Sequence, residues 1–448
     1  MNTQPARGMR DFLAADVRRR EHVVSVIKGV YERYGFEPLE TPAVENLETL
    51  MGKYGEEGNQ LIFKILKRGE HEHTGAADLA LRYDLTVPLA RVVAEYRATL
   101  PRFFKRYQIQ PVWRADRPAR GRFREFYQCD VDALGSRSVV VEAELCAAAS
   151  EALRALGFRD FAIRLNHRQA LAGILDSCGI EAARHGEALV ALDKLDKIGR
   201  EGVARELLER GIAEPAGAQL LRFFGELAAL AQHSEAMLAH LAQLIGGHEA
   251  GMRGAQELQQ ILLLADAAGA GPHLKIDLSL ARGLSYYTAA IMEVNVPDLA
   301  GSLGGGGRYD HLVGMFLGED VPACGFSLGL ERIIVVMTER QMFPPTVVAT
   351  PADVMVTVWN EAELAGALAL AQELRAAGLR TDLYPEADKL GKQFKHAASR
   401  NIPLVAIVGD DERARGQVTI KDLRTGQQVT VPRASAPRML KRDSVDCP

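Results

Sequence analysis

Side chains that could bind phosphate, a base and an amine follow one another in residues 113–132 of this 448-residue sequence. Five arginines fall within eleven residues of this stretch: Arg114, Arg117, Arg120, Arg122 and Arg124. From Arg122 onward, the even positions carry arginine, an aromatic ring, an amide and carboxylates, whereas the odd positions are mostly apolar. This period of two predicts a strand with two different faces. Guanidinium groups suit phosphate oxygens, an aromatic face suits a base, and carboxylates suit an amine or an imidazole.

Residues 106–113 alternate in the same way, so the two runs together predict a β-hairpin with an arginine-rich loop. A second interpretation fits the hairpin equally well, because alternating charges are also typical of a solvated, salt-bridged surface strand. Taken alone, the hairpin leaves a binding face and an ordinary surface open as alternatives.

The composition predicts a soluble protein with more than one domain. A chain of 448 residues is expected to form two or three domains. A net charge of −4 argues against a broadly basic nucleic-acid coat, so contact with a polyanion must come from local patches. Five scattered cysteines without a C-x-x-C pair predict a reducing, cytoplasmic location. We find no signal peptide and no apolar run of membrane-spanning length, so no membrane partner is expected.

Two further features could be sites, but each has an ordinary structural explanation. His71 and His73 stand two residues apart, yet no third metal ligand follows at a recognisable spacing. We therefore expect a solvated loop there and assign no metal site. Four consecutive glycines at 304–307 do not match the G-x-G-x-x-G dinucleotide motif. In isolation, such a run favours a flexible turn.

The apolar pattern predicts a mixed α and β N-terminal part with a helical block inside it. Residues 16–34 predict an amphipathic helix. Residues 79–86 predict a strand with Arg82, Asp84 and Thr86 on one face. Residues 168–270 are rich in Ala, Leu, Glu and Gln and predict several helices between two β-rich regions. This order indicates an inserted helical subdomain.

Residues 341–351, which contain three prolines, predict a linker. Beyond the linker, strands and helices alternate as in a small α/β domain. Lys389 and Lys392 share one side of a helix predicted at 388–400, and a solvated helix face explains them without any ligand. The tail after Pro432 is expected to be disordered.

Five segments, taken in order, resemble a known family. They are an extended segment with Pro42, Arg114 at the end of the first hairpin strand, RGLSYYT at 282–288, GGRYD at 306–310 and GFSLGLER at 325–332. The first, second and last resemble motifs 1, 2 and 3 of class II aminoacyl-tRNA synthetases. The other two are similar to the signatures of the histidyl-tRNA synthetases within that class. The resemblance covers essentially the whole chain.

The resemblance implies an α+β catalytic domain, built on an antiparallel sheet, at residues 1–340. A helical insertion at 168–270 would interrupt this domain, and a small α/β anticodon-binding domain would follow at 351–448. The implied reaction is ATP-dependent activation of L-histidine to histidyl-adenylate, followed by transfer of histidine to the 3′ end of tRNA(His). Mg2+ is expected with ATP, and a homodimer is implied, with residues 37–45 at its interface.

Attack of the histidine carboxylate on the α-phosphate requires positioning and positive charge rather than an enzyme nucleophile. By their places in the motifs, Arg114 and Arg282 resemble the catalytic arginines on opposite sides of the α-phosphate. ATP would also contact Arg122, Glu125, Phe126 and Arg332. Histidine would contact Asp84, Thr86, Gln128, Asp132, Tyr286, Tyr287 and Tyr309. The tRNA would contact Arg117, Arg120, Lys389 and Lys392.

Two departures from the family pattern concern the expected pocket. Ser285 stands where many members have Asp, so no role is assigned to it. Asp84 and Asp132 stand where some members have Glu, and a shorter carboxylate requires the pocket to move in by about one methylene.

The main rival interpretation is a synthetase-like regulatory subunit of histidine biosynthesis that does not charge tRNA. Such paralogues lack the C-terminal domain and tend to lose the arginines of the ATP site, whereas this chain keeps both. A pure RNA-binding module is a second rival, which the near-neutral charge disfavours.

Overall fold

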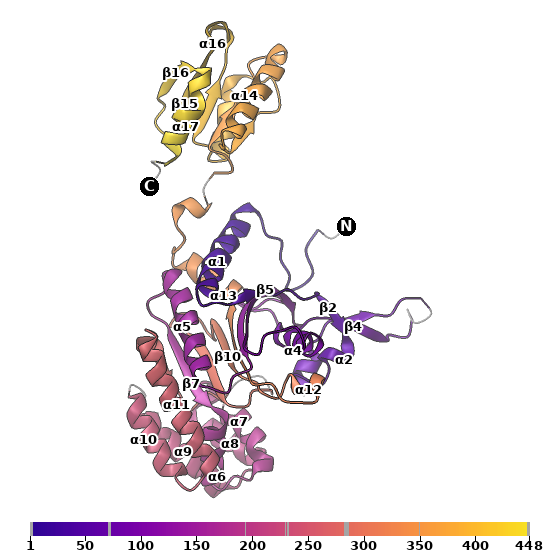
Figure 1. Cartoon of the computed structure of the whole chain (residues 1–448), viewed down its shortest axis with the longest axis vertical. Helices are drawn as coiled ribbons and strands as arrows, with labels where there is room; N and C mark the ends of the chain where they lie inside the picture. Colours follow the sequence, from indigo (N-terminus) through magenta and orange to yellow (C-terminus); the bar gives the residue numbers. More distant parts are fainter. Residues whose placement is uncertain are drawn as a thin grey trace. The chain divides into compact units, whose positions relative to one another are not determined.

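The predicted arginine hairpin lies in the middle of a sheet that organises the larger of two units, Met1–Phe343 and Pro344–Pro448. The computed structural model describes residues 3–69, 73–192, 194–228, 230, 233–281, 286–348 and 350–445. Figure 1 shows the elements of both units. Within those ranges, none of the helices combines the length and the apolar character that crossing a bilayer would require.

The sheet of the larger unit has eight strands in the order β1-β5-β6-β11-β10-β9-β7-β8. The six inner strands are antiparallel, and β1 and β8 join the two edges in parallel. The bounds are β1 (Glu37–Pro38), β5 (Phe104–Trp113), β6 (Glu125–Leu134), β7 (Ala162–His167), β8 (Leu274–Ile276), β9 (Ala290–Asn295), β10 (Gly304–Arg308) and β11 (Ala323–Gly329). The expected antiparallel class of fold is confirmed.

Strands β5 and β6 form the predicted hairpin. Their register runs from Phe104 opposite Leu134 to Trp113 opposite Glu125. The arginine-rich loop lies between them, and the Arg114 amide donates to the Arg124 carbonyl at 2.9 Å. The second strand begins at Glu125, three residues later than the alternation suggested, because residues 119–122 form a turn of their own.

The glycine run is a strand, β10, and the flexible-turn interpretation is wrong. Gly304–Arg308 pairs with β11 on one side and with β9 on the other. A Cβ added at Gly304 or Gly306 would overlap a backbone carbonyl oxygen of β11. Glycine is therefore needed here for close approach of two backbones rather than for a bend.

Three helices pack on the face of the sheet that holds the odd-numbered residues of β6. They are α1 (Ala14–Arg33), α5 (Val140–Ala155) and α13 (Leu330–Glu339). Cys129 and Val131 of β6 are fully buried in the same hydrophobic core as Ile27 of α1 and Leu145 of α5. The even-numbered residues of β6 therefore point away from this core.

The strand predicted at residues 79–86 is partly wrong. Strand β4 (Ala77–Leu81) ends before Arg82, and Thr86 is the first residue of α4 (Thr86–Glu95). The helix starts there because the Asp84 carboxylate accepts the Val87 amide at 3.0 Å, and Pro88 is tolerated in a first helical turn.

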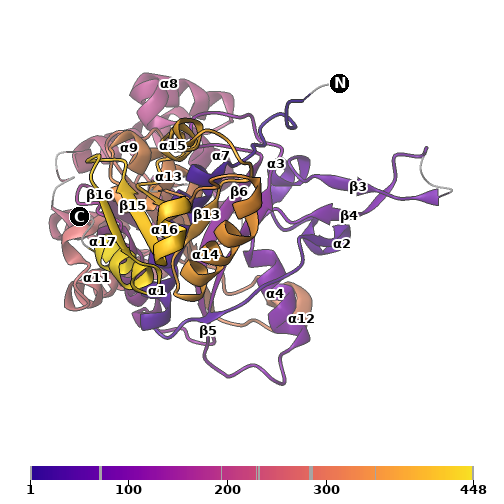
Figure 2. The same ribbon diagram turned by 90° about the horizontal axis from the view of Figure 1, so that it is seen from above.

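Strand β4 belongs to a separate three-stranded sheet with β2 (Val44–Asn46) and β3 (Lys64–Leu66). The β3–β4 pair projects from the body of its unit in both views (Figures 1 and 2). Three short helices complete this region: α2 (Leu47–Leu50), α3 (Gly55–Gln60) and α12 (Gly314–Leu317). Of the two histidines considered for a metal, His73 is exposed, and His71 lies outside the described residues.

The helical block predicted at 168–270 is present between β7 and β8. Its helices are α6 (Arg168–Ser177), α7 (His185–Leu192), α8 (Leu195–Glu209), α9 (Glu214–Ala228), α10 (Ser234–Ile245) and α11 (Glu249–Ala267). They gather beside the β7–β8 edge of the sheet (Figure 1). His167, at the end of β7, lies 3.0 Å from the carboxylate of Glu257 on α11 and links the block to the sheet.

The smaller unit has the predicted α/β pattern. Its five-stranded sheet has the order β13-β12-β14-β15-β16, with the first three strands parallel. The bounds are β12 (Val354–Val356), α14 (Leu364–Ala376), β13 (Thr381–Leu383), α15 (Leu390–Ser399), β14 (Leu404–Ile407), α16 (Asp410–Arg415), β15 (Gln417–Asp422), β16 (Gln428–Pro432) and α17 (Ala436–Val445). The expectation of a disordered tail is wrong, because Ala436 and Leu440 of α17 are buried in the core of this unit.

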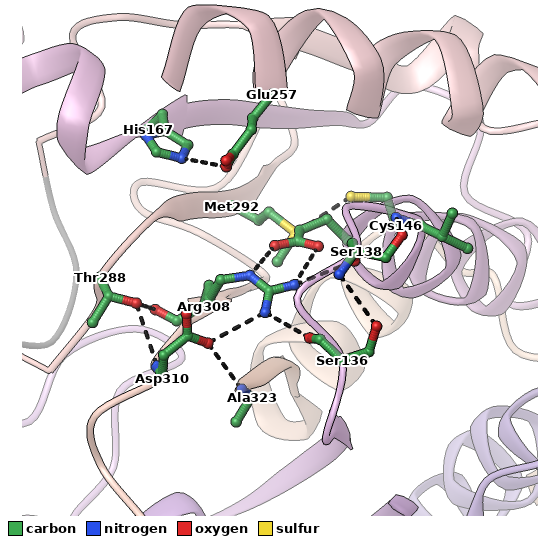
Figure 3. A network of polar contacts seen from close by, with 12 residues as sticks. Ser136, Ser138, Cys146, His167, Glu257, Thr288, Met292, Arg308, Asp310 and Ala323 are labelled. Atoms are coloured by element: carbon green, nitrogen blue, oxygen red, sulfur yellow. Dashed lines mark hydrogen bonds and ion pairs between the residues drawn. The ribbon is translucent and has the colours of Figure 1, made fainter. Parts of the chain in front are cut away.

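A buried ion pair joins the sheet to α5. Arg308, at the end of β10, contacts both carboxylate oxygens of Glu142 at 2.6 and 2.8 Å, and the two side chains are 4% and 1% exposed. The same guanidinium donates to the Ser136 carbonyl and contacts Asp310 (Figure 3). Thr288 lies against the Arg308 carbonyl, with its amide at 2.8 Å. This network fixes the chain on both sides of Arg308.

Replacing one partner of this pair is expected to destabilise the larger unit. Glu142→Gln removes the carboxylate that both Nε and Nη2 of the buried Arg308 contact and leaves only the longer contact to Asp310 at 3.2 Å, and breaking a buried pair lowers the free energy of unfolding by about 3–5 kcal/mol. The two tryptophans lie one in each unit, at Trp113 and Trp359. Urea unfolding followed by fluorescence in a Trp359→Phe background therefore reports on the larger unit alone.

The matched control is Glu249→Gln, which removes an exposed partner of Arg253 and should change the stability by less than about 1 kcal/mol. The double replacement Glu142→Leu with Arg308→Met should restore most of the loss. Equal unfolding midpoints for Glu142→Gln and Glu249→Gln would contradict the importance of the buried pair.

Candidate active site

A cavity of about 330 Å3 lies over the face of the sheet that carries the even-numbered residues of β6. Strand β6 contributes Phe126, Gln128, Asp130 and Asp132 to its lining. The hairpin loop, α4, β9, β10, β11 and the start of α13 supply the other walls. Nine of the residues singled out from the sequence line it: Thr86, Arg114, Arg122, Phe126, Gln128, Asp132, Tyr287, Tyr309 and Arg332. The alternation of the sequence therefore marked a cavity and not a solvated surface.

Three arginines, Arg114, Arg122 and Arg332, lie at the hairpin-loop end of the cavity. Arg332 donates to the carbonyl oxygens of Ser302 and Gly121, while Arg114 donates to the Tyr83 carbonyl at 3.0 Å. Burial lowers the pKa of Arg332, and the neighbouring charge of Arg122 lowers it further. Arg122 forms an ion pair with the lining residue Asp116 at 3.3 Å, whereas among the described residues neither Arg114 nor Arg332 has an ion-pair partner, so two unpaired guanidinium groups make this end of the cavity positive.

Phe126 lies beside this positive end. Its ring centroid is 5.2 Å from the Arg114 guanidinium, and Tyr83 holds the same guanidinium from another side at 4.3 Å. Glu125, the neighbouring residue, is exposed and is not part of the cavity lining. The aromatic face expected for a base is thus present, whereas Glu125 lies at the outer margin.

The opposite end of β6 is acidic and buried. Asp132 accepts the Tyr309 hydroxyl and forms an ion pair with Arg106 of β5 at 2.8 Å. Burial raises the pKa of Asp132, and the Arg106 charge opposes that rise. Arg106 is completely buried and was not singled out from the sequence, because its alternating strand offered no way to tell a buried charge from a surface one.

Asp130 is a second buried carboxylate in the cavity that sequence reasoning left without a role. It is 2% exposed, and Gln128 donates to it at 3.3 Å. Gln128 also donates to the Ser327 hydroxyl at 3.1 Å. Burial raises the pKa of Asp130 to about 7. Its even position on the strand was the signal that could have identified it.

Two tyrosines, Tyr287 and Tyr309, line the acidic end, and Tyr286 packs against both without lining the cavity itself. Tyr286 contacts the rings of Tyr287 and Tyr309 edge-on, with centroids 5.1 and 5.9 Å away. The Tyr286 hydroxyl donates to Asp84 at 3.2 Å, and the Tyr54 hydroxyl donates to the same carboxylate at 3.0 Å. Asp84 is not a lining residue, so it supports Tyr286 and the start of α4 from behind.

Glycines make room for these side chains. A Cβ at Gly325 would overlap the Asp132 carboxylate, and a Cβ at Gly307 would lie 3.0 Å from the Tyr287 ring. The floor of the cavity between β6 and β9 is therefore bare backbone.

Burial raises the pKa of a further lining carboxylate, Glu331, to about 7, and that carboxylate accepts the Tyr127 amide at 2.9 Å.

The remaining sequence candidates lie elsewhere. Arg282 and Ser285 are outside the described residues. Arg117 is exposed, and Arg120 contacts Glu339 and the Asp298 carbonyl. Lys389 and Lys392 are exposed at the start of α15 in the smaller unit, where Lys392 pairs with Asp388 at 2.8 Å. In the described ranges we find no cluster of three or more histidine, cysteine or acidic side chains arranged for a metal ion.

One cavity thus combines a cationic end beside an aromatic ring with an acidic end among tyrosines. The first arrangement can hold the phosphates and base of a nucleotide, and the second can hold a cationic or imidazole-bearing group. Along β6, Phe126 and Asp132 are separated by about 20 Å of strand. Both groups can therefore occupy the cavity together.

The comparisons with known proteins agree with this arrangement. A family model described as histidyl-tRNA synthetase matches residues 8–333, and one described as an anticodon binding domain matches residues 353–443. The histidine–tRNA ligase of Porphyromonas gingivalis is 44% identical over 96% of this chain and 97% of its own. That of Flavobacterium johnsoniae is 41% identical over 95% and 96%.

The crystal structure of the histidyl-tRNA synthetase from Nostoc sp. PCC 7120 matches with a TM-score of 0.81 and 34% identity. It covers 99% of this chain and 100% of that one. Taken together, the two family models cover both units of the chain, and the relatives and the matching crystal structure each extend over both units. The chain belongs to the histidyl-tRNA synthetase family.

Proposed function

We propose that this chain is a histidine–tRNA ligase, which activates L-histidine with ATP and transfers it to the 3′ end of tRNA(His). Membership of the family supports the reaction. The observation in the structure that carries the proposal is the two-ended cavity, with Arg114, Arg122 and Arg332 at one end and Asp130 and Asp132 at the other. A nucleotide and an amino acid fit these two ends by charge.

In the first step, a histidine carboxylate oxygen forms a bond to the α-phosphorus, and the bond from that phosphorus to pyrophosphate breaks. Arg114 holds the α-phosphate, with Arg282 as the proposed second arginine. Arg332 and Arg122 hold the γ-phosphate, Phe126 stacks on adenine, and Glu125 contacts its amino group. Fixed positive charge stabilises the transition state because negative charge builds up on the phosphoryl oxygens.

The amino-acid end holds the substrate in the orientation that the attack requires. Thr86 and Gln128 contact the α-amino group, with Asp84 behind them. Asp132 and Tyr287 bracket the imidazole, which needs an acceptor at one ring nitrogen and a partner at the other. Tyr286 and Tyr309 shape the pocket around it.

In the second step, a ribose hydroxyl of the terminal adenosine attacks the carbonyl carbon, and AMP leaves. Arg117 and Arg120 are proposed to face the acceptor end, and Lys389 and Lys392 are proposed to contact the tRNA from the smaller unit. Mg2+ would enter with ATP through the phosphate oxygens. Glu293 lines the cavity and acts electrostatically on Arg332, and we propose that it offers a carboxylate oxygen to this Mg2+. A cytoplasmic homodimer with residues 37–45 at its interface completes the proposal.

Histidine-dependent exchange between ATP and pyrophosphate tests the first step directly. The purified chain should incorporate labelled pyrophosphate into ATP only when L-histidine is present. A folded protein that binds histidine without any exchange would contradict the ligase proposal and would instead fit the synthetase-like regulatory subunit.

Arg332→Gln should lower kcat/KM for the exchange by about 100-fold or more, because it removes one preorganised charge from the phosphate end. The glutamine amide nitrogen lies where Arg332 has its Nε and can keep the contact to the Gly121 carbonyl, so the fold should survive. The matched control is Arg120→Gln at an exposed arginine of the hairpin loop. It should leave exchange near the parent rate and weaken only tRNA charging. Similar exchange rates for the two variants would show that Arg332 does not bind phosphate.

Removing the smaller unit should separate the two steps. A chain that ends at Phe343 should keep amino-acid activation within a few-fold, whereas its KM for tRNA should rise strongly. The unit boundary leaves the core of the larger unit intact. Equal loss of pyrophosphate exchange and tRNA charging would contradict separate roles for the units.

A further inference from the structure

Asp130 is a buried carboxylate of the amino-acid end of the cavity to which no step of the proposed reaction gives a role. On the face of the sheet, it stands between Gln108 of β5 and Ser327 of β11. Its neighbours along β6 are Gln128 and Asp132, which also line the cavity. Asp130 therefore lies under the middle of the amino-acid end, between the groups proposed for the α-amino group and for the imidazole.

The charges around Asp130 do not balance. Three carboxylates, Asp84, Asp130 and Asp132, are at most 2% exposed in this region. Two buried cations act on this region: Arg106, whose ion pair goes to Asp132 at 2.8 Å, and Arg82, which acts on Asp130 through its charge but donates its hydrogen bonds to the carbonyl oxygens of Thr41 and Pro111. Asp130 receives neutral donors instead, the Gln128 amide and the Ser327 hydroxyl. The tyrosines nearby, Tyr287 and Tyr309, add no positive charge.

Open hydrogen-bonding positions at the same place point to a ligand. The amide oxygen of Gln128 has no hydrogen-bond partner among the described residues, although its side chain is 9% exposed and lines the cavity. Such a buried acceptor requires a donor, because an unsatisfied polar group costs free energy. A protonated amine supplies both the missing donor and the missing positive charge.

We propose, resting on the function above, that Asp130 is a specificity-determining carboxylate of the amino-acid end, which pairs in its charged form with a protonated amine and holds a proton more readily when the cavity is empty. A buried carboxyl with too little positive charge around it holds its proton. Burial raises the pKa of Asp130 to about 7, and Asp132 and Asp84 add to that rise while Arg106 opposes it. Entry of the amine favours the charged form, so binding releases a proton.

The sign of the pH dependence follows from this exchange. Above about pH 7, Asp130 is already charged in the empty cavity, and the amine binds at full affinity. Below about pH 7, binding must first displace a proton, and the affinity falls by about tenfold per pH unit. The histidine imidazole and the other pocket carboxylates titrate as well. The imidazole titrates in every variant, so its contribution cancels when two variants are compared at the same pH, whereas Asp132 and Asp84 act on Asp130 and belong to the effect that the comparison measures.

Titration calorimetry with L-histidine tests the inference on the full-length protein at pH 6, 7 and 8. The ratio of the Kd of Asp130→Asn to that of the parent should be about ten at pH 8 and close to one at pH 6. The parent should also release more protons on binding than Asp130→Asn, measured at pH 7 in two buffers of different ionisation heat. A ratio that is independent of pH, or equal proton release, would overturn the inference.

A second variant keeps the carboxylate and protects the test against a folding defect. Ser327→Ala removes a donor that stabilises charged Asp130, so its affinity should reach the plateau at a higher pH than that of the parent. An unchanged midpoint would count against the inference. Failure of the parent to bind L-histidine at any pH would overturn the proposed function itself, whereas normal binding with a flat ratio overturns this inference alone.

Discussion

The register of β6 is the constraint on which the rest of the larger unit depends. Side chains alternate between the two faces of a strand, so a slip of one residue would exchange the core face and the cavity face. In the observed register, Cys129 and Val131 are buried under helices, and Gln128, Asp130 and Asp132 line the cavity. Ten paired positions with β5 and seven with β11 hold this register.

Charge and burial work against each other within the cavity. Carboxylates at the centre of a sheet lose hydration, and their pKa values rise unless a cation compensates. Arg106 forms an ion pair with Asp132, whereas the side-chain hydrogen bonds to Asp130 and Asp84 come from neutral donors. At the other end of the cavity, the charge of Arg332 is not neutralised, because carbonyl oxygens rather than a carboxylate accept its hydrogen bonds. Substrates would therefore compensate the charges at both ends of the cavity better than the protein itself does.

The sequence predicted those features that depend on local periodicity. The hairpin, the helical block and the strands of the smaller unit follow from alternation and composition, and all are present. The start of α4 was misread because residues 79–86 alternate as a strand would. In the structure, the helix begins at Thr86, where the Asp84 carboxylate accepts the Val87 amide and Pro88 fits in the first turn. The glycine run was misread because the need for glycine comes from strands far away in the sequence.

The candidate site was predictable only in part, for a related reason. Alternation assigned Gln128 and Asp132 to one face and would have assigned Asp130 to it as well. Alternation could not show that Arg106 on the neighbouring strand forms its ion pair with Asp132 rather than with Asp130, because ion pairing depends on the three-dimensional arrangement of the side chains. Position in a motif identified Arg332, while the carbonyls that hold it come from two distant loops.

The helical block between β7 and β8 has a consequence for how such a chain can vary. The two strands are immediate parallel neighbours, with Ile163 opposite Leu274. The chain therefore leaves the sheet at the carboxyl end of β7 and crosses over to re-enter it at the amino end of its neighbour β8. More than one hundred residues lie between these strands, yet they alter neither the strand order nor the positions of the cavity residues. Evolution or protein engineering could exchange this block as a module, provided that its replacement makes the same crossover from the carboxyl end of β7 to the amino end of β8.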